Sequence, residues 1–225
     1  EKFRALLDGD TNTVINKINN DKGYQLVKSL ADAYVKNIAP KYDELNLKNI
    51  ATQRTYMKAI MELSPKSARI FPDANSTLRV TYGKVKGYKP ADAIYYEPFS
   101  TLDGVMEKYI PGDYEFDVPQ KLIDLYNAKD FGMYANSKGK MPVAFIATNH
   151  TTGGNSGSPA LDASGNLIGL NFDRVWEGTM SDIYYSPEIC RNIMVDLRYV
   201  LFIIDKYAGA KNIINELKII KKEKK

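Results

Sequence analysis

Apolar residues recur at helical spacing through the first 70 residues. Leu26, Leu30 and Tyr34 stand four positions apart, and a second apolar stripe follows over residues 50–61. This period predicts amphipathic helices whose apolar faces form a core. The simplest interpretation of this segment is a helical hairpin or bundle with no chemistry of its own.

Capping residues mark where these helices begin and end. Asp21 can cap the start of the first helix, and Pro40 lies just past its end. The pair Ser64-Pro65 closes the second helix.

Beyond the helical segment, the pattern changes to the alternation of strands. Residues 78–82 alternate apolar and polar side chains, and Gly83 then interrupts the pattern. We expect a strand with a bend or bulge at this glycine. Further strands are expected over 93–96 and 142–148, with a short helix over 119–126 that has proline in its first turn.

A hairpin and a long helix complete the pattern. Residues 158–173 predict a hairpin with its turn at 162–165, and residues 196–217 predict one long helix. Helices, then strands, then one closing helix indicate an α+β protein rather than a doubly wound sheet. The expected parts are 1–70, 71–195 and 196–225.

The net charge of the chain comes from its last eight residues. The chain has 225 residues, of which 44% are apolar and 26% charged, as in folded globular proteins. Its formal charge is +4, and residues 218–225, with five lysines and one glutamate, account for all of it. We interpret this tail as a solvated helix end. Because the remaining positive and negative charges balance, no basic face indicates a nucleic-acid partner.

Scarce cysteine and histidine exclude several kinds of site. A single Cys190 excludes an intrachain disulfide and a cysteine-based zinc site, and a single His150 argues against a multi-histidine metal centre. We therefore expect no metal and no cofactor. No apolar stretch approaches the roughly 20 residues of a membrane span. No signal peptide is recognised, and because the chain starts at Glu1 without Met, we expect a processed or truncated piece.

The densest candidate for chemistry is the glycine-rich segment 151–159, which surrounds Ser156. A nucleophilic serine needs a tight exposed turn with backbone N–H groups beside it to hold a developing oxyanion. The spacing is not that of the α/β-hydrolase nucleophile elbow, because Gly154 fits but Ser158 does not. The segment is similar to the Gly-x-Ser-Gly-x-Pro sequence of chymotrypsin-like serine peptidases. The alternative is a glycine-rich approach to a hairpin without a catalytic role.

His150 is a poor candidate for the general base. It stands only six residues before Ser156, whereas the base of a chymotrypsin-like peptidase comes from the other β-barrel. We expect His150 at the end of the strand that leads into the serine loop. The 225 residues then cannot complete a triad, so the chain is either not an enzyme or part of a longer one.

Two charged neighbours follow the predicted hairpin, in the segment 172–178. In chymotrypsin-like folds this region lines the pocket for the residue before the scissile bond. A half-buried Arg174 would present a planar fork to a carboxylate, and Asp173 could hold a substrate ammonium group. The alternative is that both charges pair with other surface groups.

Three segments together resemble the bacterial serine dipeptidyl-peptidases of types 7 and 11. They are 153–159, 171–178 and 195–207, and the upstream segments 72–75 and 78–83 are also similar. The resemblance extends from about Phe71 to Leu217, and the helical first part matches more weakly.

The resemblance implies a fold and a set of roles. It implies the C-terminal part of a chymotrypsin-like double β-barrel enzyme: the end of an α-helical cap domain, the second barrel and a C-terminal helix. Ser156 would be the nucleophile, and the N–H groups of Gly154 and Ser156 would form the oxyanion hole. Asp173 would help to bind the substrate α-amino group, beside Phe172 in the same substrate-binding segment. Arginine at Arg174, where other members have glycine, implies the type 11 preference for Asp or Glu as the second residue.

The resemblance also implies a context. The catalytic histidine and aspartate would lie in the N-terminal portion of the same protein, and the substrates would be peptides with a free N-terminus. A homodimer in the periplasm or on the surface of a Gram-negative bacterium is expected. Two alternatives stay open: the apolar specificity of type 7, and a non-catalytic peptide-binding module on the same fold.

Overall fold

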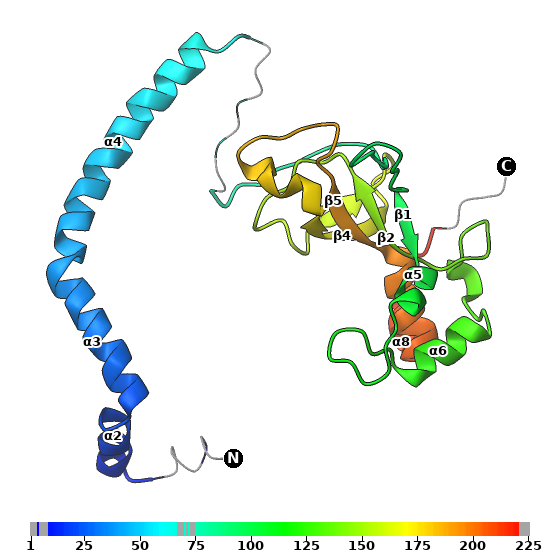
Figure 1. Cartoon of the computed structure of the whole chain (residues 1–225), viewed down its shortest axis with the longest axis horizontal. Helices are drawn as coiled ribbons and strands as arrows, with labels where there is room; N and C mark the ends of the chain where they lie inside the picture. Colours follow the sequence, from blue (N-terminus) through cyan, green and yellow to red (C-terminus); the bar gives the residue numbers. More distant parts are fainter. Residues whose placement is uncertain (1–3, 5–8, 67–69, 71, 73–74, 221–225) are drawn as a thin grey trace. The chain divides into compact units, whose positions relative to one another are not determined.

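The computed structural model of the chain describes residues 4, 9–66, 70, 72 and 75–220. The chain divides into two compact units, Glu1–Thr77 and Leu78–Lys225 (Figure 1). The expected boundary at Phe71 and the last five residues of the lysine tail lie outside the described residues. No helix among the described residues is long and apolar enough to cross a membrane.

The helix ends in the first unit are where the sequence predicts them. The helices are α2 (Thr11–Asn19), α3 (Lys22–Asn37) and α4 (Ala39–Leu63). The Asp21 side chain caps α3 by accepting a hydrogen bond of 2.8 Å from the Tyr24 N–H. Pro40 stands in the first turn of α4, where its missing N–H costs nothing, and Ser64 ends this helix.

The expected helical hairpin with an apolar core is wrong for the described residues. Helices α3 and α4 continue along one curved path instead of folding back on each other (Figure 1). No residue of α2, α3 or α4 is buried, and Leu26 and Leu30 are 61% and 63% exposed. An apolar stripe is buried only against a second layer, and these helices, placed end to end, do not supply one.

The second unit is built on one antiparallel sheet, which confirms the α+β class. Its strand order is β1-β2-β5-β4-β3, and every neighbouring pair is antiparallel. Within the described residues the sheet is open, with β1 and β3 at its edges, rather than a closed barrel. The strands are β1 (Phe99–Thr101), β2 (Pro142–Ala147), β3 (Pro159–Leu161), β4 (Leu167–Arg174) and β5 (Asn192–Asp196).

The strand prediction is right for β2 and for the hairpin of β3 and β4, and wrong for the two earlier segments. Residues 78–85 and 93–96 form no strand and make only isolated bridges, Val85 with Ala147 and Tyr96 with Tyr88, and Ala93 lies in a turn with φ +59°. Gly83 marks a close backbone approach, because a Cβ atom there would lie 2.7 Å from the Asn149 nitrogen. The alternating pattern is local, so it does not reveal that these segments lack a continuous partner strand.

The predicted long C-terminal helix is interrupted. Asp196 caps α7 (Leu197–Phe202) by accepting a hydrogen bond from the Arg198 N–H. A π-helical turn follows over Ile203–Tyr207, and α8 (Lys211–Glu216) begins only after Gly209, whose φ is +70°. Since a left-handed φ ends a helix, the glycine divides the helix in two. Residues 218–220 of the tail are not helical.

The core of the second unit lies between the short helices and one end of the sheet. Helices α5 (Leu102–Glu107) and α6 (Gln120–Asn127) pack there with α7, which contributes the fully buried Phe202. A smaller cluster lies under the sheet itself. These two apolar clusters stabilise strands β2, β4 and β5, which carry the candidate site. The members are Leu102, Val118, Leu122, Phe131, Tyr134, Met141, Leu201 and Phe202 in the first cluster, and Phe145, Ala147 and Met194 in the second.

Candidate active site

Ser156 stands exposed in a tight loop that joins β2 to β3. Two glycines of the loop have left-handed backbones, Gly154 with φ +99° and Gly157 with φ +83°, which favour glycine over any residue with a Cβ atom. The Gly157 N–H donates a hydrogen bond of 2.7 Å to the Asn171 carbonyl, which ties the loop to β4. The sequence thus predicts an exposed serine at a glycine turn, and the structure has one.

The loop offers free backbone donors beside the serine hydroxyl. Among the described residues, neither the Gly154 N–H nor the Ser156 N–H donates a hydrogen bond to the protein. The Ser156 Oγ lies 3.4 Å from the Phe172 carbonyl oxygen, a long contact that leaves the hydroxyl available. Unused N–H groups next to an exposed hydroxyl are what an oxyanion-stabilising serine site requires.

A buried pair of asparagines, which sequence reasoning missed, supports the loop from below. The Asn171 amide nitrogen donates to the Asn155 carbonyl at 3.2 Å, and the Asn192 amide nitrogen donates to Asn171 Oδ1 at 2.8 Å. Asn192 is 1% exposed, and its Oδ1 has no partner among the described residues. The pair connects the serine loop to β4 and β5, and no local sequence signal predicts this long-range contact.

A β-bulge in β4 turns two candidate substrate-binding residues outward. Asn171 pairs with Met194, but Asp173 already pairs with Ile193, so Phe172 is an extra residue in the ladder. As a result Phe172 and Asp173 are both exposed on a strand whose preceding residues alternate between buried and less buried positions. One Asp173 carboxylate oxygen accepts a hydrogen bond of 2.8 Å from the Arg174 N–H.

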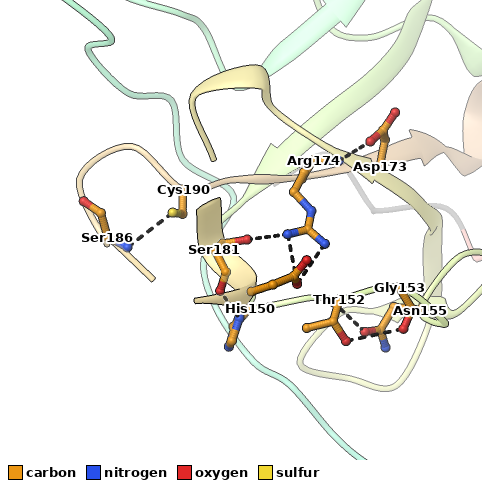
Figure 2. A network of polar contacts seen from close by, with 10 residues as sticks. His150, Thr152, Gly153, Asn155, Asp173, Arg174, Ser181, Ser186 and Cys190 are labelled. Atoms are coloured by element: carbon orange, nitrogen blue, oxygen red, sulfur yellow. Dashed lines mark hydrogen bonds and ion pairs between the residues drawn. The ribbon is translucent and has the colours of Figure 1, made fainter. Parts of the chain in front are cut away.

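Arg174 ends β4 with its guanidinium held by two neighbours. Its side chain is 19% exposed. Nη1 donates to Ser181 Oγ at 2.8 Å, and Asp182 Oδ1 lies 3.0 Å from both Nη1 and Nη2. Figure 2 shows the Arg174 side chain directed toward Ser181. The guanidinium therefore has a fixed direction and is not free in solvent.

His150 lies three residues beyond the end of β2, at the place that the sequence predicts. Its Nε2 is 2.9 Å from the Ser181 carbonyl oxygen, so Nε2 is the donor in this contact. Its ring lies 5.1 Å from that of Tyr185. The His150 ring thus faces Ser181 (Figure 2), the residue whose hydroxyl accepts from Arg174.

A buried arginine that sequence reasoning missed, Arg191, lies near the site. Arg191 is 3% exposed and donates to backbone carbonyls of two segments, including those of Lys86 at 3.0 Å and Cys190 at 2.7 Å. Its guanidinium lies 5.5 Å from the centre of the Tyr88 ring. Burial, with the hydrogen bond that Tyr88 donates to Glu177 at 2.6 Å, raises the pKa of the Tyr88 phenol well above its usual range.

The structure thus brings some of the predicted site residues together. Ser156 and Phe172 meet across the loop and β4, and Asp173 and Arg174 follow directly on the same strand. Gly154 lies in the serine loop. His150 joins the surroundings of Arg174 through Ser181.

Comparison with known proteins shows the family of the chain. The model of the peptidase S46 family matches residues 1–219. The Asp/Glu-specific dipeptidyl-peptidase of Flavobacterium psychrophilum is 73% identical over 99% of the chain, and the dipeptidyl-peptidase 7 of Porphyromonas gingivalis is 39% identical over 98%. The crystal structure of Porphyromonas endodontalis DPP11 in complex with substrate matches with a TM-score of 0.83 at 45% identity, over 95% of the chain.

The chain spans only about a third of these relatives. It covers 31% of the Flavobacterium protein, 31% of the Porphyromonas gingivalis protein and 31% of the DPP11 chain. The family match nevertheless covers nearly all of the chain, and the fold match confirms the expected resemblance. The chain therefore belongs to the peptidase S46 family.

Proposed function

We propose that this chain is the C-terminal part of a serine peptidase that releases dipeptides from peptide N-termini and prefers Asp or Glu as the second residue. The observation that carries the proposal is the placement of Ser156 against Phe172, two residues before Arg174 on the same strand. The nucleophile thus contacts the same strand that carries, two residues further on, a cation able to recognise carboxylates.

Ser156 acts as the nucleophile in this proposal. Its Oγ attacks the carbonyl carbon of the scissile bond, and the hydroxyl proton passes to a histidine in the N-terminal portion of the same protein. The N–H groups of Gly154 and Ser156 stabilise the resulting oxyanion. The proton then goes to the leaving amine, and water hydrolyses the acyl-enzyme to regenerate the serine.

Asp173 and Arg174 select the substrate. The exposed carboxylate of Asp173 binds the free α-amino group of the peptide, which limits cleavage to the second residue from the N-terminus. Arg174 binds the acidic side chain of that residue through charge-assisted hydrogen bonds. The name of the 73% identical relative, an Asp/Glu-specific dipeptidyl-peptidase, supports this choice over the apolar specificity of type 7.

The remaining parts of the proposal concern the whole protein. Residues 1–70 are the end of an α-helical cap domain, residues 71–195 belong to the second β-barrel, and residues 196–225 are the C-terminal helical segment and basic tail. The part of the relatives that the chain does not cover supplies the catalytic histidine and aspartate. The protein is a homodimer located in the periplasm or at the cell surface, as the family resemblance implies.

The test uses the whole protein with matched dipeptide substrates that carry Asp or Leu at the second position. We expect preferred turnover of the Asp substrate and covalent labelling of Ser156 by a fluorophosphonate. Ser156→Ala removes both turnover and labelling, while Ser158→Ala, in the same loop, retains them. Absence of turnover and of labelling in the native protein would instead indicate a non-catalytic peptide-binding module.

A further inference from the structure

The guanidinium of Arg174 has five N–H donors, and its protein contacts use only some of them. Nη1 donates to Ser181 Oγ, and Nη2 donates to Asp182 Oδ1, which also forms an ion pair with Nη1 at 3.0 Å. Among the described residues, Arg174 Nε makes no hydrogen bond. Two donors are left, the Nε hydrogen and the second Nη2 hydrogen.

These two remaining donors lie along one edge of the guanidinium. The Nη1–Nη2 edge is taken by the Asp182 carboxylate, and the Nε–Nη2 edge is the other edge that can bind both oxygens of a carboxylate in parallel. Arg174 is therefore paired and oriented by the protein, yet keeps a complete two-donor edge for a second carboxylate.

Ser181 is itself held in place from two sides. It is 6% exposed, its hydroxyl accepts from Arg174, and its carbonyl accepts from His150 Nε2 at 2.9 Å. Ser181 and Asp182 end the 3₁₀ helix Trp176–Asp182, which is separated from Arg174 by Val175 alone. The partners of Arg174 are thus set by a short rigid turn and by an imidazole behind it.

We propose that Ser181 and Asp182 are positioning residues for the acidic specificity, with His150 supporting Ser181. Ser181 holds Nη1 and Asp182 holds the Nη1–Nη2 edge, so that the Nε–Nη2 edge faces the side-chain carboxylate of the second substrate residue. This inference rests on the proposed function and assigns residues that act through Arg174 without touching the reacting atoms.

The arrangement also explains why the Asp182 carboxylate lies beside Arg174, although Arg174 has to bind the carboxylate of the substrate. A guanidinium that is 19% exposed is costly to leave unpaired before substrate arrives. Asp182, with a side chain 55% exposed, satisfies part of this need from the solvent side. A flexible arginine would in addition lose rotamer entropy each time it bound substrate. Both effects favour a guanidinium that is fixed in advance.

The experiment measures kcat and KM of the whole protein on the Asp and Leu substrates. For Ser181→Ala and Asp182→Ala, we expect kcat/KM on the Asp substrate to fall by about tenfold or more, mainly through KM, because charge-assisted hydrogen bonds to Arg174 are lost. Turnover of the Leu substrate stays within about twofold. Ser181→Thr, which keeps the hydroxyl, restores most of the lost Asp turnover.

Two controls make the result decisive. Asp130→Ala removes a comparable exposed carboxylate that pairs with Lys206 at 2.7 Å, and we expect it to change neither substrate. Arg174→Gly shows how far specificity can fall. Equal losses on both substrates, or no loss on the Asp substrate, would overturn the positioning roles.

The two levels of the proposal fail in different ways. A native protein without preference for the Asp substrate would overturn the proposed function and this inference together. A native preference that disappears in Arg174→Gly but persists in Ser181→Ala and Asp182→Ala would overturn only the inference.

Discussion

Replacing Arg191 with methionine removes a buried guanidinium that connects two segments distant in sequence. Arg191 donates to the Lys86 and Gly87 carbonyls at 3.0 and 3.1 Å, and to the Pro187 and Cys190 carbonyls at 2.9 and 2.7 Å. Methionine fills similar volume but donates to none of these four oxygens. The substitution therefore tests whether this arginine joins the segment 86–87 to the start of β5.

The expected loss can be worked from these contacts. A buried acceptor left without a donor costs about 1–3 kcal/mol. Part of this cost is offset, because the variant no longer buries a charge and because water can reach some of the carbonyls. We therefore expect the free energy of local opening around β5 to fall by about 3 kcal/mol rather than by the full sum. With about 1.4 kcal/mol for each factor of ten, this is roughly a 100-fold change in the opening equilibrium.

Hydrogen–deuterium exchange of the whole protein measures this opening directly. We expect amides of the peptide spanning residues 187–196 to exchange about 100-fold faster in Arg191→Met. Arg54→Met, at an exposed position of α4, is the matched control and should leave this peptide unchanged. Exchange in Arg191→Met within about threefold of the native rate would refute the reasoning, because it would mean that the four contacts contribute almost nothing.

Three further results are expected from single positions. Gly169→Ala should lower the free energy of unfolding of the second unit by about 1–3 kcal/mol, because a Cβ atom there would lie 2.6 Å from the Val195 carbonyl oxygen. Urea unfolding measures this loss, and a loss smaller than about 1 kcal/mol would contradict the expected overpacking. His150→Ala should lower cleavage of acidic substrates by less than about 100-fold, whereas a loss of about 10⁴-fold would identify His150 as the general base after all. Burial and the hydrogen bond to Asp205 raise the pKa of Tyr134 from 10.0 to about 12. Because the pKa of Tyr134 is higher in the folded state, its contribution to the free energy of unfolding is complete below pH 10 and is lost as pH rises toward 12. Thermal unfolding should therefore depend less steeply on pH in this range for Tyr134→Phe than for the native protein.

Local signals in the sequence predicted the serine loop well. The glycines at Gly154 and Gly157 indicate backbone angles that few other residues adopt, and the structure has left-handed φ values at both. The hairpin of β3 and β4 follows from alternation and turn residues within a short stretch. These features depend on neighbours along the chain, so the sequence displays them directly.

The contacts that were missed are those between distant residues. Asn171 and Asn192 are 21 positions apart, and Arg191 reaches back 105 positions to the Lys86 carbonyl. Asparagine and arginine are usually exposed, so nothing in the pattern predicts that these three are buried. The β4 bulge at Phe172 is likewise set by pairing with β5 and has no local signal.

Two errors have a common cause in how helices are inferred. Apolar periodicity predicts a buried face, but Leu26 and Leu30 stay exposed because no second layer of described residues covers them. The same periodicity predicted one helix over 196–217, although Gly209 with its positive φ ends it. A periodic apolar stripe indicates a helix. Tertiary contacts decide what the helix packs against, and single residues such as Gly209 decide where it ends.

The most direct measurement is the ratio of kcat/KM on Asp and Leu substrates for the whole protein, native and Arg174→Gly. Arg174 places a half-buried guanidinium with two unused donors on the strand beside Ser156. We expect the native protein to favour the Asp substrate by about 100-fold or more, and Arg174→Gly to remove most of this preference. Equal turnover of both substrates by the native protein, or an Asp preference that survives Arg174→Gly, would contradict the assignment of Arg174 as the determinant of specificity.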